Sequence, residues 1–270
     1  MTQHEQERFD YSKKCPENYH GLSLPPLDLP RLDLSSYGIT VEQIGEMART
    51  RRWGELVELR LADNPLGSAE GDLFAHFVIP PKCRNLDLRG TNLTASDFIR
   101  FKDLPPTGSL VTLNLSRNEL SDEGAFALSE SAALQGLREL LISAHRLSAA
   151  GLAVLLGGVR LRELASLHLD NIPSTEAVYS LLEKAPVLTN LEVLSFGPSI
   201  VSGLNRGERE WWSGFHPTSN GERFMCTAML LDRNKFPALR WVRAGDAIWS
   251  VTRSGFLQTE IPYEPGIDFL

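Results

Sequence analysis

LVTLNL (residues 110–115) and LRELLI (residues 137–142) are two copies of one six-residue pattern, leucine-x-x-leucine-x-leucine, and this pattern decides the fold. Copies of it, some with another apolar residue in place of a leucine, begin at Leu29, Leu56, Cys83, Leu110, Leu137, Leu164 and Leu191. Each copy starts 27 residues after the one before it. An unbroken period of this length predicts a solenoid, in which similar structural units stack on one another.

Each unit is expected to contain one strand and one helix. Alternate residues of a strand point to opposite faces, so the leucines of the pattern point into the core. Helix-capping residues follow at the same interval, and Thr40 with Gln43 and Thr94 with Asp97 resemble capping boxes. Seven residues after each cap stands an apolar residue that should pack on the strands: Met47, Phe74, Phe101, Leu128, Leu155 and Leu182. Stacking such units predicts an α/β solenoid whose stability comes from contacts between neighbours.

The chain resembles the ribonuclease-inhibitor-like leucine-rich repeats over residues 29–196. The stretches that carry the resemblance are NLDLRGTNLTASDF (residues 85–98) and LVTLNLSRNELSDEGAFAL (residues 110–128). The resemblance implies a curved solenoid, with parallel strands on the concave face and full helices on the convex face. It also implies a scaffold that binds proteins, without naming the partner.

The ninth position of the repeat departs from that family. It usually carries an asparagine whose side chain satisfies backbone groups of the turn, but here the column is Tyr37, Asn64, Thr91, Asn118, His145, Ile172 and Ser199. We therefore expect less regular turns at the two ends of the solenoid. We interpret His145 as a structural substitute in this column.

The repeat pattern divides the chain into four parts. Residues 1–28 lack the repeat and are interpreted as an N-terminal arm or cap, and residues 29–197 contain six to seven repeats. Residues 198–238 interrupt the register, and residues 239–270 begin with LRWVRA, a degenerate last repeat, followed by an acidic tail. The interruption contains Trp211 and Trp212, which either plug the open end of the core or anchor a partner, since tryptophan is enriched at binding hot spots.

Composition narrows the classes of function. The chain has 270 residues and a net charge of −7, which argues against sequence-independent binding of nucleic acid. It contains no apolar run of about 18 residues and no apolar signal core, so we expect neither a membrane span nor secretion. Its three cysteines are far apart in sequence, which fits neither a disulfide framework nor a zinc site. A cytoplasmic protein without cofactors is the expectation.

The strand positions that face away from the core are the candidate binding surface. At the fifth position of successive repeats, Asp33, Arg60 and Asp87 should form a row of alternating charge, because neighbouring strands lie about 4.8 Å apart. His168 and Asp170 should project the same way, roughly 6 to 7 Å apart, but no nucleophile column lies beside them. The residues predicted to bind a protein are Asp33, Arg60, Asp87, Arg89, Asn114, His168, Asp170, Trp211 and Trp212.

The leading functional hypothesis is a non-enzymatic module that binds one protein partner through the concave face and the aromatic insertion. It depends on the repeat, on the lack of metalloprotease, phosphate-binding or serine-hydrolase motifs, and on the aromatic cluster outside the register. The alternative is a structural or regulatory subunit permanently built into a larger protein assembly, with contacts at its ends.

Overall fold

The computed structural model describes residues 30–49, 51–67, 73–143, 146–170, 183–196, 232–244, 247–251 and 256–258. Within these ranges the strands form one ten-stranded sheet in chain order from β1 to β10. The strands are β1 Arg31–Asp33, β2 Glu58–Arg60, β3 Asn85–Asp87, β4 Thr112–Leu115, β5 Glu139–Ser143, β6 Ser166–Asp170, β7 Val193–Phe196, β8 Trp241–Ala244, β9 Ala247–Val251 and β10 Phe256–Gln258.

The first eight strands are parallel and share one register. Leu86 lies opposite Leu113, and Leu113 lies opposite Leu140, so the same repeat position meets itself in every pair. β9 runs in the opposite direction and pairs antiparallel with both β8 and β10, so that β10 again runs in the direction of the first eight strands. The predicted α/β solenoid is confirmed, and the antiparallel end is an addition that the repeat pattern did not predict.

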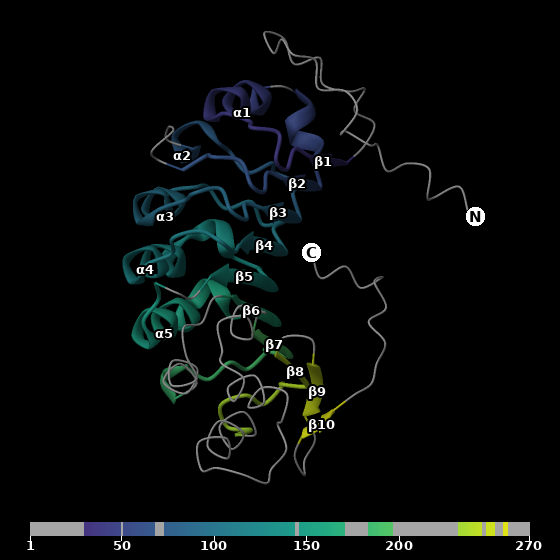
Figure 1. Cartoon of the computed structure of the whole chain (residues 1–270), viewed down its shortest axis with the longest axis vertical. Coiled ribbons are helices and arrows are strands. Elements are labelled where there is room, and N and C mark those ends of the chain that lie inside the picture. The colour runs from purple at the N-terminus through teal and green to yellow at the C-terminus, as the bar shows by residue number, and fades with distance from the viewer. Residues whose placement is uncertain are drawn as a thin grey trace, which may run out of the picture.

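The helices cover one side of the sheet, and the strands form the inner side of an arc (Figure 1). We call the strand side that faces away from the helices the concave face. The α-helices described are α1 Val41–Ala48, α2 Leu73–His76, α3 Ala95–Phe101, α4 Asp122–Glu130 and α5 Ala149–Gly157, and short 3-10 helices lie at Arg51–Glu55, Ala132–Leu134 and Val159–Leu161.

Polar caps begin α1, α3, α4 and α5 as the sequence predicted. The Thr40 side chain accepts a hydrogen bond from the backbone N–H of Gln43, and the Gln43 side chain accepts one from that of Thr40, at 3.4 and 2.9 Å. At α3 the Asp97 carboxylate accepts from the backbone N–H of Thr94 at 2.8 Å. Gly67 stands where other repeats carry Thr or Ser, because a Cβ there would lie 1.8 Å from the backbone oxygen of Asn92.

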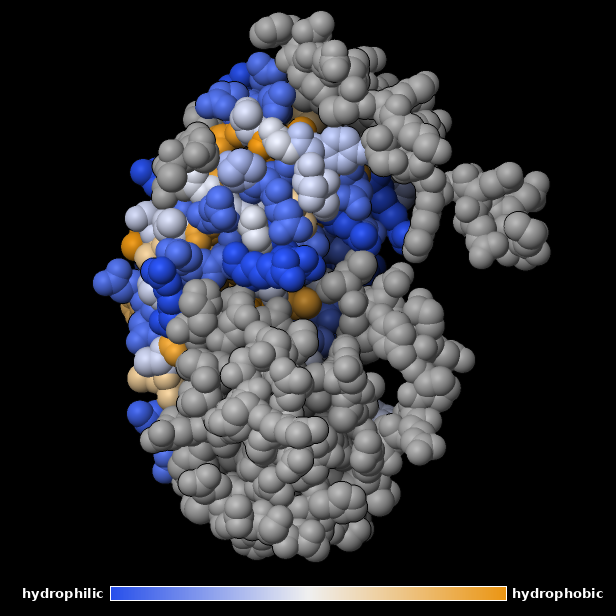
Figure 2. All heavy atoms as spheres, viewed as in Figure 1, coloured by the Kyte–Doolittle hydropathy of each residue, from blue (hydrophilic) through white to orange (hydrophobic). Residues whose placement is uncertain are grey.

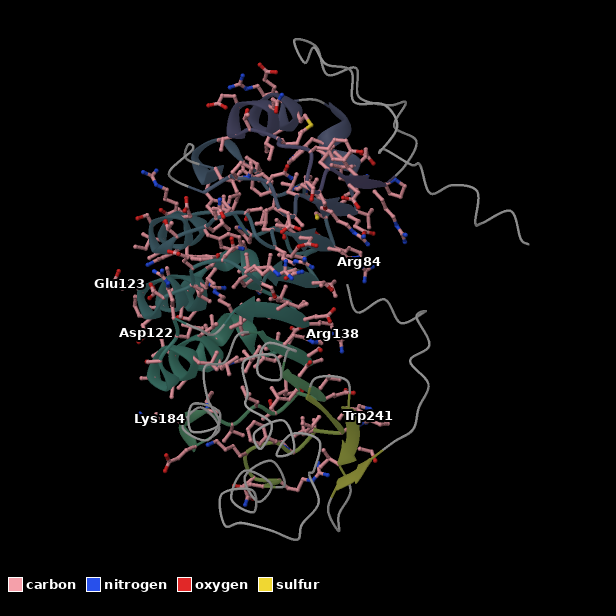
Figure 3. All side chains as sticks on the ribbon, in the orientation of Figure 1. Arg84, Asp122, Glu123, Arg138, Lys184 and Trp241 are labelled. Carbon is pink, nitrogen blue, oxygen red and sulfur yellow. The ribbon has the colours of Figure 1, made fainter. Side chains whose placement is uncertain are left out.

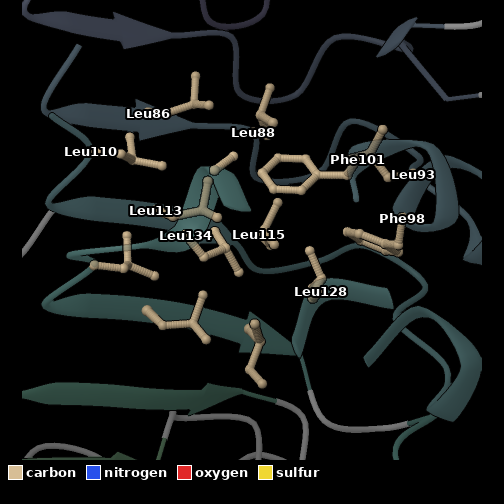
Figure 4. Close-up of a cluster of buried hydrophobic side chains, with 14 of the residues drawn as sticks. Leu86, Leu88, Leu93, Phe98, Phe101, Leu110, Leu113, Leu115, Leu128 and Leu134 are labelled. Atoms are coloured by element: carbon tan, nitrogen blue, oxygen red, sulfur yellow. The ribbon is translucent and has the colours of Figure 1, made fainter. Parts of the chain in front are cut away.

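The core is a continuous column of leucines between the strands and the helices (Figure 4). Leu113, Leu115 and Leu128 are completely buried, and Phe98 and Phe101 fill the space under α3. The predicted inward helix column is confirmed where the structure describes it, at Met47, Phe74, Phe101, Leu128 and Leu155.

The asparagines of the ninth position each connect two neighbouring turns. Asn118 Nδ2 donates to the carbonyls of Leu88 and Leu115, at 2.7 and 3.1 Å, while its Oδ1 accepts from the N–H groups of Thr91 and Leu93. One asparagine thus serves its own repeat and the preceding one. The side chain of His145 lies outside the described residues, so its interpretation stays a prediction.

LRWVRA forms the eighth parallel strand of the sheet. β8 pairs with β7 with Val242 opposite Leu194, which keeps the register of the repeats. A backbone hydrogen bond from Leu239 N–H to the Phe236 carbonyl repeats the bonds that precede earlier strands, such as Leu137 to Leu134. Phe236 is buried and continues the core past residue 197. Residues 1–29 and 197–231, including Trp211 and Trp212, lie outside the described residues, so the domain boundaries remain a prediction.

Candidate protein-binding surface

Side chains at the third and fifth repeat positions form rows across the concave face. The strand register places Asp33 opposite Arg60, Arg60 opposite Asp87, and Asp87 opposite Asn114. The sheet thus brings together the predicted residues of the first four repeats. It places His168 farther along the same row, opposite Leu141 of β5.

Arg60 is the centre of the charged part of this surface. Its guanidinium forms ion pairs with Asp33 at 3.8 Å and with Glu58 at 2.6 Å. Glu58 also pairs with Arg31 at 3.3 Å, and its side chain is only 8% exposed. The sequence predicted that Arg60 lies between Asp33 and Asp87. In the structure Arg60 forms its ion pairs with Asp33 and Glu58 instead. The spacing contained the signal, since Glu58 and Arg60 are two residues apart on one strand face.

The side chains of Asp87 and Asn114 accept hydrogen bonds from the backbone and also lie on the concave face. Asp87 Oδ1 accepts a hydrogen bond from the N–H of Arg89 at 2.9 Å, and Asn114 Oδ1 accepts one from Ser116 at 3.0 Å. Burial raises the pKa of the Asp87 carboxyl, although its bond to the Arg89 N–H and the charges of Arg89 and Arg60 lower it. These bonds assign a structural role to two residues that the sequence placed in the binding surface.

Arg89 lies near the end of the charged region. Its guanidinium approaches the Asp63 carboxylate at 3.8 Å, with about two fifths of each side chain exposed. Its Nε is buried, and it has no hydrogen-bond partner within the described part of the chain.

His168 is bonded to a residue of the neighbouring strand. Its Nε2 lies 3.1 Å from Glu139 Oε1 and 2.8 Å from Ser166 Oγ, and Thr112 Oγ1 donates to Glu139 Oε2 at 3.1 Å. The backbone of Asp170 belongs to β6, but its side chain is not among those described. Sequence reasoning paired His168 with Asp170 and missed Glu139, whose only signal was its place in the third-position row of β5.

The contacts of His168 differ from those of a serine-histidine-carboxylate relay. Such a relay uses one ring nitrogen for the serine and the other for the acid, whereas Ser166 and Glu139 both contact Nε2. This arrangement fixes the orientation of the imidazole on the concave face.

The concave face changes in character along the solenoid. The first two strands carry the charged network, while Leu141, Val193 and Trp241 are half-buried apolar side chains on β5, β7 and β8. Val193 lies opposite Trp241 in the strand register, and Figure 3 shows Trp241 on the strand side of the molecule. A ligand along this face would meet charges at one end and apolar surface at the other.

The described residues offer neither a metal site nor a membrane-spanning helix. No group of three or more His, Cys, Asp or Glu side chains in these ranges is arranged to hold a metal ion. Nor does any helix described here have the length and apolarity needed to cross a bilayer.

Comparison with known proteins agrees with the architecture. A family model described as "Leucine Rich repeat" matches residues 109–129. The ribonuclease inhibitor of Sus scrofa is 32% identical over 117 residues, which are 42% of this chain and 26% of that protein. The match thus spans about a quarter of the inhibitor.

Among solved structures, the leucine-rich repeat-containing protein LegL7 of Legionella pneumophila is similar at 16% identity. The TM-score is 0.46, and the match covers 80% of this chain and 72% of LegL7. The 27-residue period and the in-register parallel strands give the chain a leucine-rich repeat solenoid fold, and in sequence it is similar to leucine-rich repeats and to part of a ribonuclease inhibitor.

Proposed function

We propose that this chain is a non-enzymatic interaction module that binds a protein partner on its concave face. Leucine-rich repeat proteins in general act through protein–protein interaction. The observation that carries the proposal is the partly exposed charged network around Arg60, in register across β1 and β2. Its members form no part of the leucine core, and Arg31 is 77% exposed at its side chain.

The two halves of the face would contribute differently to binding. Exposed charges steer encounter and set specificity, and their effect weakens as salt screens them. Half-buried apolar groups such as Leu141 and Trp241 lose little further freedom when a partner covers them, so they suit the desolvated centre of an interface.

Arg60→Ala tests the charged network directly. Glu58 keeps its ion pair with Arg31 in this variant, so we expect the free energy of unfolding to change by less than about 1 kcal/mol. Lys102→Ala is the matched control, because it removes an ion pair with Glu130 between helices α3 and α4.

Affinity capture followed by mass spectrometry is the readout. We expect a protein that is retained by the wild type and by Lys102→Ala but lost, in a salt-dependent manner, by Arg60→Ala. This result supports the concave face as the binding surface. Equal retention by all three proteins at every salt concentration contradicts it.

The aromatic insertion is the second part of the proposed binding surface. Paired tryptophans in a soluble monomer seldom stay exposed without a use, so Trp211 and Trp212 are expected to anchor the partner. In the variant Trp211→Ala with Trp212→Ala, partner capture should be lost while the circular-dichroism melt is unchanged. If the double variant no longer shows a folding transition, the tryptophans cover the end of the core instead. If it both folds and binds like the wild type, the insertion is not part of the interface.

A permanent subunit of a larger assembly is the second candidate. Ile99, Phe126 and Val154 on helices α3, α4 and α5 are 45–54% exposed, and Figure 2 shows hydrophobic patches along the helix side. Apolar side chains on neighbouring helices favour a covered convex surface. Light scattering after size exclusion separates the candidates, since an isolated monomer favours the transient module and an aggregating chain favours the permanent subunit.

A further inference from the structure

Two arginines beside the concave face form no ion pair with any other described residue. Arg84 and Arg138 occupy the second repeat position, directly before β3 and β5, and both are exposed. Figure 3 shows both on the strand side of the molecule, away from the helices. Neither side chain forms an ion pair or a hydrogen bond within the part of the chain that the structure describes, in contrast to Arg31 and Arg60.

The backbone holds these arginines in one row with Val111. The carbonyl of Arg84 accepts the N–H groups of Val111 and Thr112 at 2.8 and 2.9 Å, and the carbonyl of Val111 accepts those of Arg138 and Glu139 at 2.9 Å. Val111 is half-buried between the two charges. Since adjacent strands lie about 4.8 Å apart, the arginine backbones are about 10 Å apart. The row presents two cations on either side of an apolar contact.

The sequence after β10 has the complementary chemistry. Residues 259–270, TEIPYEPGIDFL, contain Glu260, Glu264 and Asp268 and no Lys or Arg. Ile267 lies between the last two carboxylates in sequence. Arginine and carboxylate form strong charge-assisted pairs, so this segment matches the row in both charge and apolar character.

The length of the segment matches the distance to the row. β5 is five strands from β10 and β3 is seven strands from it, which correspond to about 24 and 34 Å at 4.8 Å per strand. Glu264 is six residues beyond Gln258 and Asp268 is ten, so at about 3.3 Å per extended residue they reach about 20 and 33 Å. The side chains of both partners close the remaining distance.

We propose that residues 259–270 bind in cis to the row formed by Arg84, Val111 and Arg138. Glu264 pairs with Arg138, Asp268 pairs with Arg84, and Ile267 covers Val111. The bound segment lies along the concave face and competes with the protein partner for it. Only this competition rests on the proposed function, since the docking of the segment is a property of the chain alone.

Hydrogen–deuterium exchange of the full chain tests the docking. A tethered segment has an effective concentration on the order of 1 mM, so an intrinsic Kd of about 0.1 mM slows exchange in residues 259–270 about tenfold. Arg84→Glu with Arg138→Glu should abolish this protection. Arg100→Glu with Lys184→Glu makes the same change in charge away from the row and should preserve it.

Variants of the segment keep the test decisive if the arginine variant folds poorly. Glu264→Gln with Asp268→Asn should also abolish protection, and Glu264→Arg with Asp268→Arg should restore it in the Arg84→Glu and Arg138→Glu background. An unprotected segment in the wild type overturns the proposal, as does equal protection in the arginine variant. Protection that grows with protein concentration also overturns it, because the segment then binds a second copy. Partner capture by Arg60→Ala is measured separately, so either idea can fail alone.

Discussion

Replacement of Asn118 by alanine is the sharpest test of how the repeats are joined. The side chain is 1% exposed and bonds to two turns at once. Its Oδ1 accepts the N–H groups of Thr91 and Leu93 at 3.1 and 3.0 Å, and its Nδ2 donates to the carbonyls of Leu88 and Leu115 at 2.7 and 3.1 Å. Asn118→Ala removes these four bonds, together with two longer ones of 3.4 Å with the Thr91 hydroxyl and the Ser116 carbonyl, and leaves the turn groups buried.

The expected loss follows from the groups left without partners. Each unsatisfied buried N–H costs about 1–3 kcal/mol, so Thr91 and Leu93 together cost about 2–6 kcal/mol. The carbonyl of Leu88 still accepts the Thr91 hydroxyl at 2.7 Å, which limits the cost on the acceptor side. We therefore expect Asn118→Ala to lower the free energy of unfolding by about 3–5 kcal/mol, against about 1 kcal/mol for Thr91→Ala.

Equilibrium urea unfolding followed by circular dichroism measures the difference. The dependence of the unfolding free energy on urea concentration should stay constant, while the urea concentration at the midpoint of unfolding falls. Asn85→Ala is the control, because it removes an asparagine from the half-buried concave face and should change stability by about 0.5 kcal/mol or less. A loss below about 1 kcal/mol for Asn118→Ala would refute the reasoning, since water or backbone movement must then satisfy the turn groups.

Three further predictions concern the core, the surface and the buried thiol. Leu113→Ala should destabilise the chain by about 2–5 kcal/mol in thermal or urea melts, because the side chain is fully buried; a loss below about 1 kcal/mol would contradict the assigned register. Burial raises the pKa of Asp87, so folding favours its protonated form and its ionisation lowers stability as pH rises through the folded pKa. Asp87→Asn should therefore raise the melting temperature at pH 7, and this gain should disappear at a pH below the pKa that Asp87 has in the unfolded chain. An equal gain in melting temperature at pH 7 and at the lower pH would show that ionisation of Asp87 does not cause it. Burial raises the pKa of Cys83 to about 12, so with Cys15 and Cys226 replaced by serine, iodoacetamide at pH 8 should label the thiol only on unfolding, and rapid labelling of the native protein would contradict its burial.

The repeat register was predictable because each of its signals is local and recurs. A leucine pattern at a constant interval places identical positions side by side in every strand pair, as Leu86, Leu113 and Leu140 show. The capping box at Thr40 and Gln43 needs only four consecutive residues, and it formed as predicted. The interval of 27 residues thus carried most of the information about the parallel sheet.

The partners of individual surface side chains were less predictable. Arg60 pairs with Glu58 on its own strand and Asp33 on the next, although the row also offered Asp87. His168 contacts Glu139, which lies diagonally opposite it on the neighbouring strand. A long side chain can reach several neighbours at similar free energy. Its rotamer and burial in the folded protein therefore determine which contact forms, and sequence spacing alone does not.

The turns also have a backbone conformation that the residue types did not predict. The eighth repeat position has a left-handed φ at Ser36, Asp63, Gly90 and Arg117, although only one of these residues is glycine. The bonds of Asn64 and Asn118 to neighbouring turns help hold this geometry. Tertiary contacts therefore impose a conformation that three of the four side chains disfavour.

The sequence by itself determined the solenoid, its register, its helix caps and its leucine core, because all of these follow from short patterns repeated at one interval. Only the tertiary structure decided that an antiparallel hairpin follows the predicted last repeat LRWVRA, and that Arg84 and Arg138 form no ion pair with any other described residue. These features depend on contacts between segments separated by a break in the period or by whole repeats. Their energies arise from burial and charge geometry in three dimensions, which no local pattern encodes.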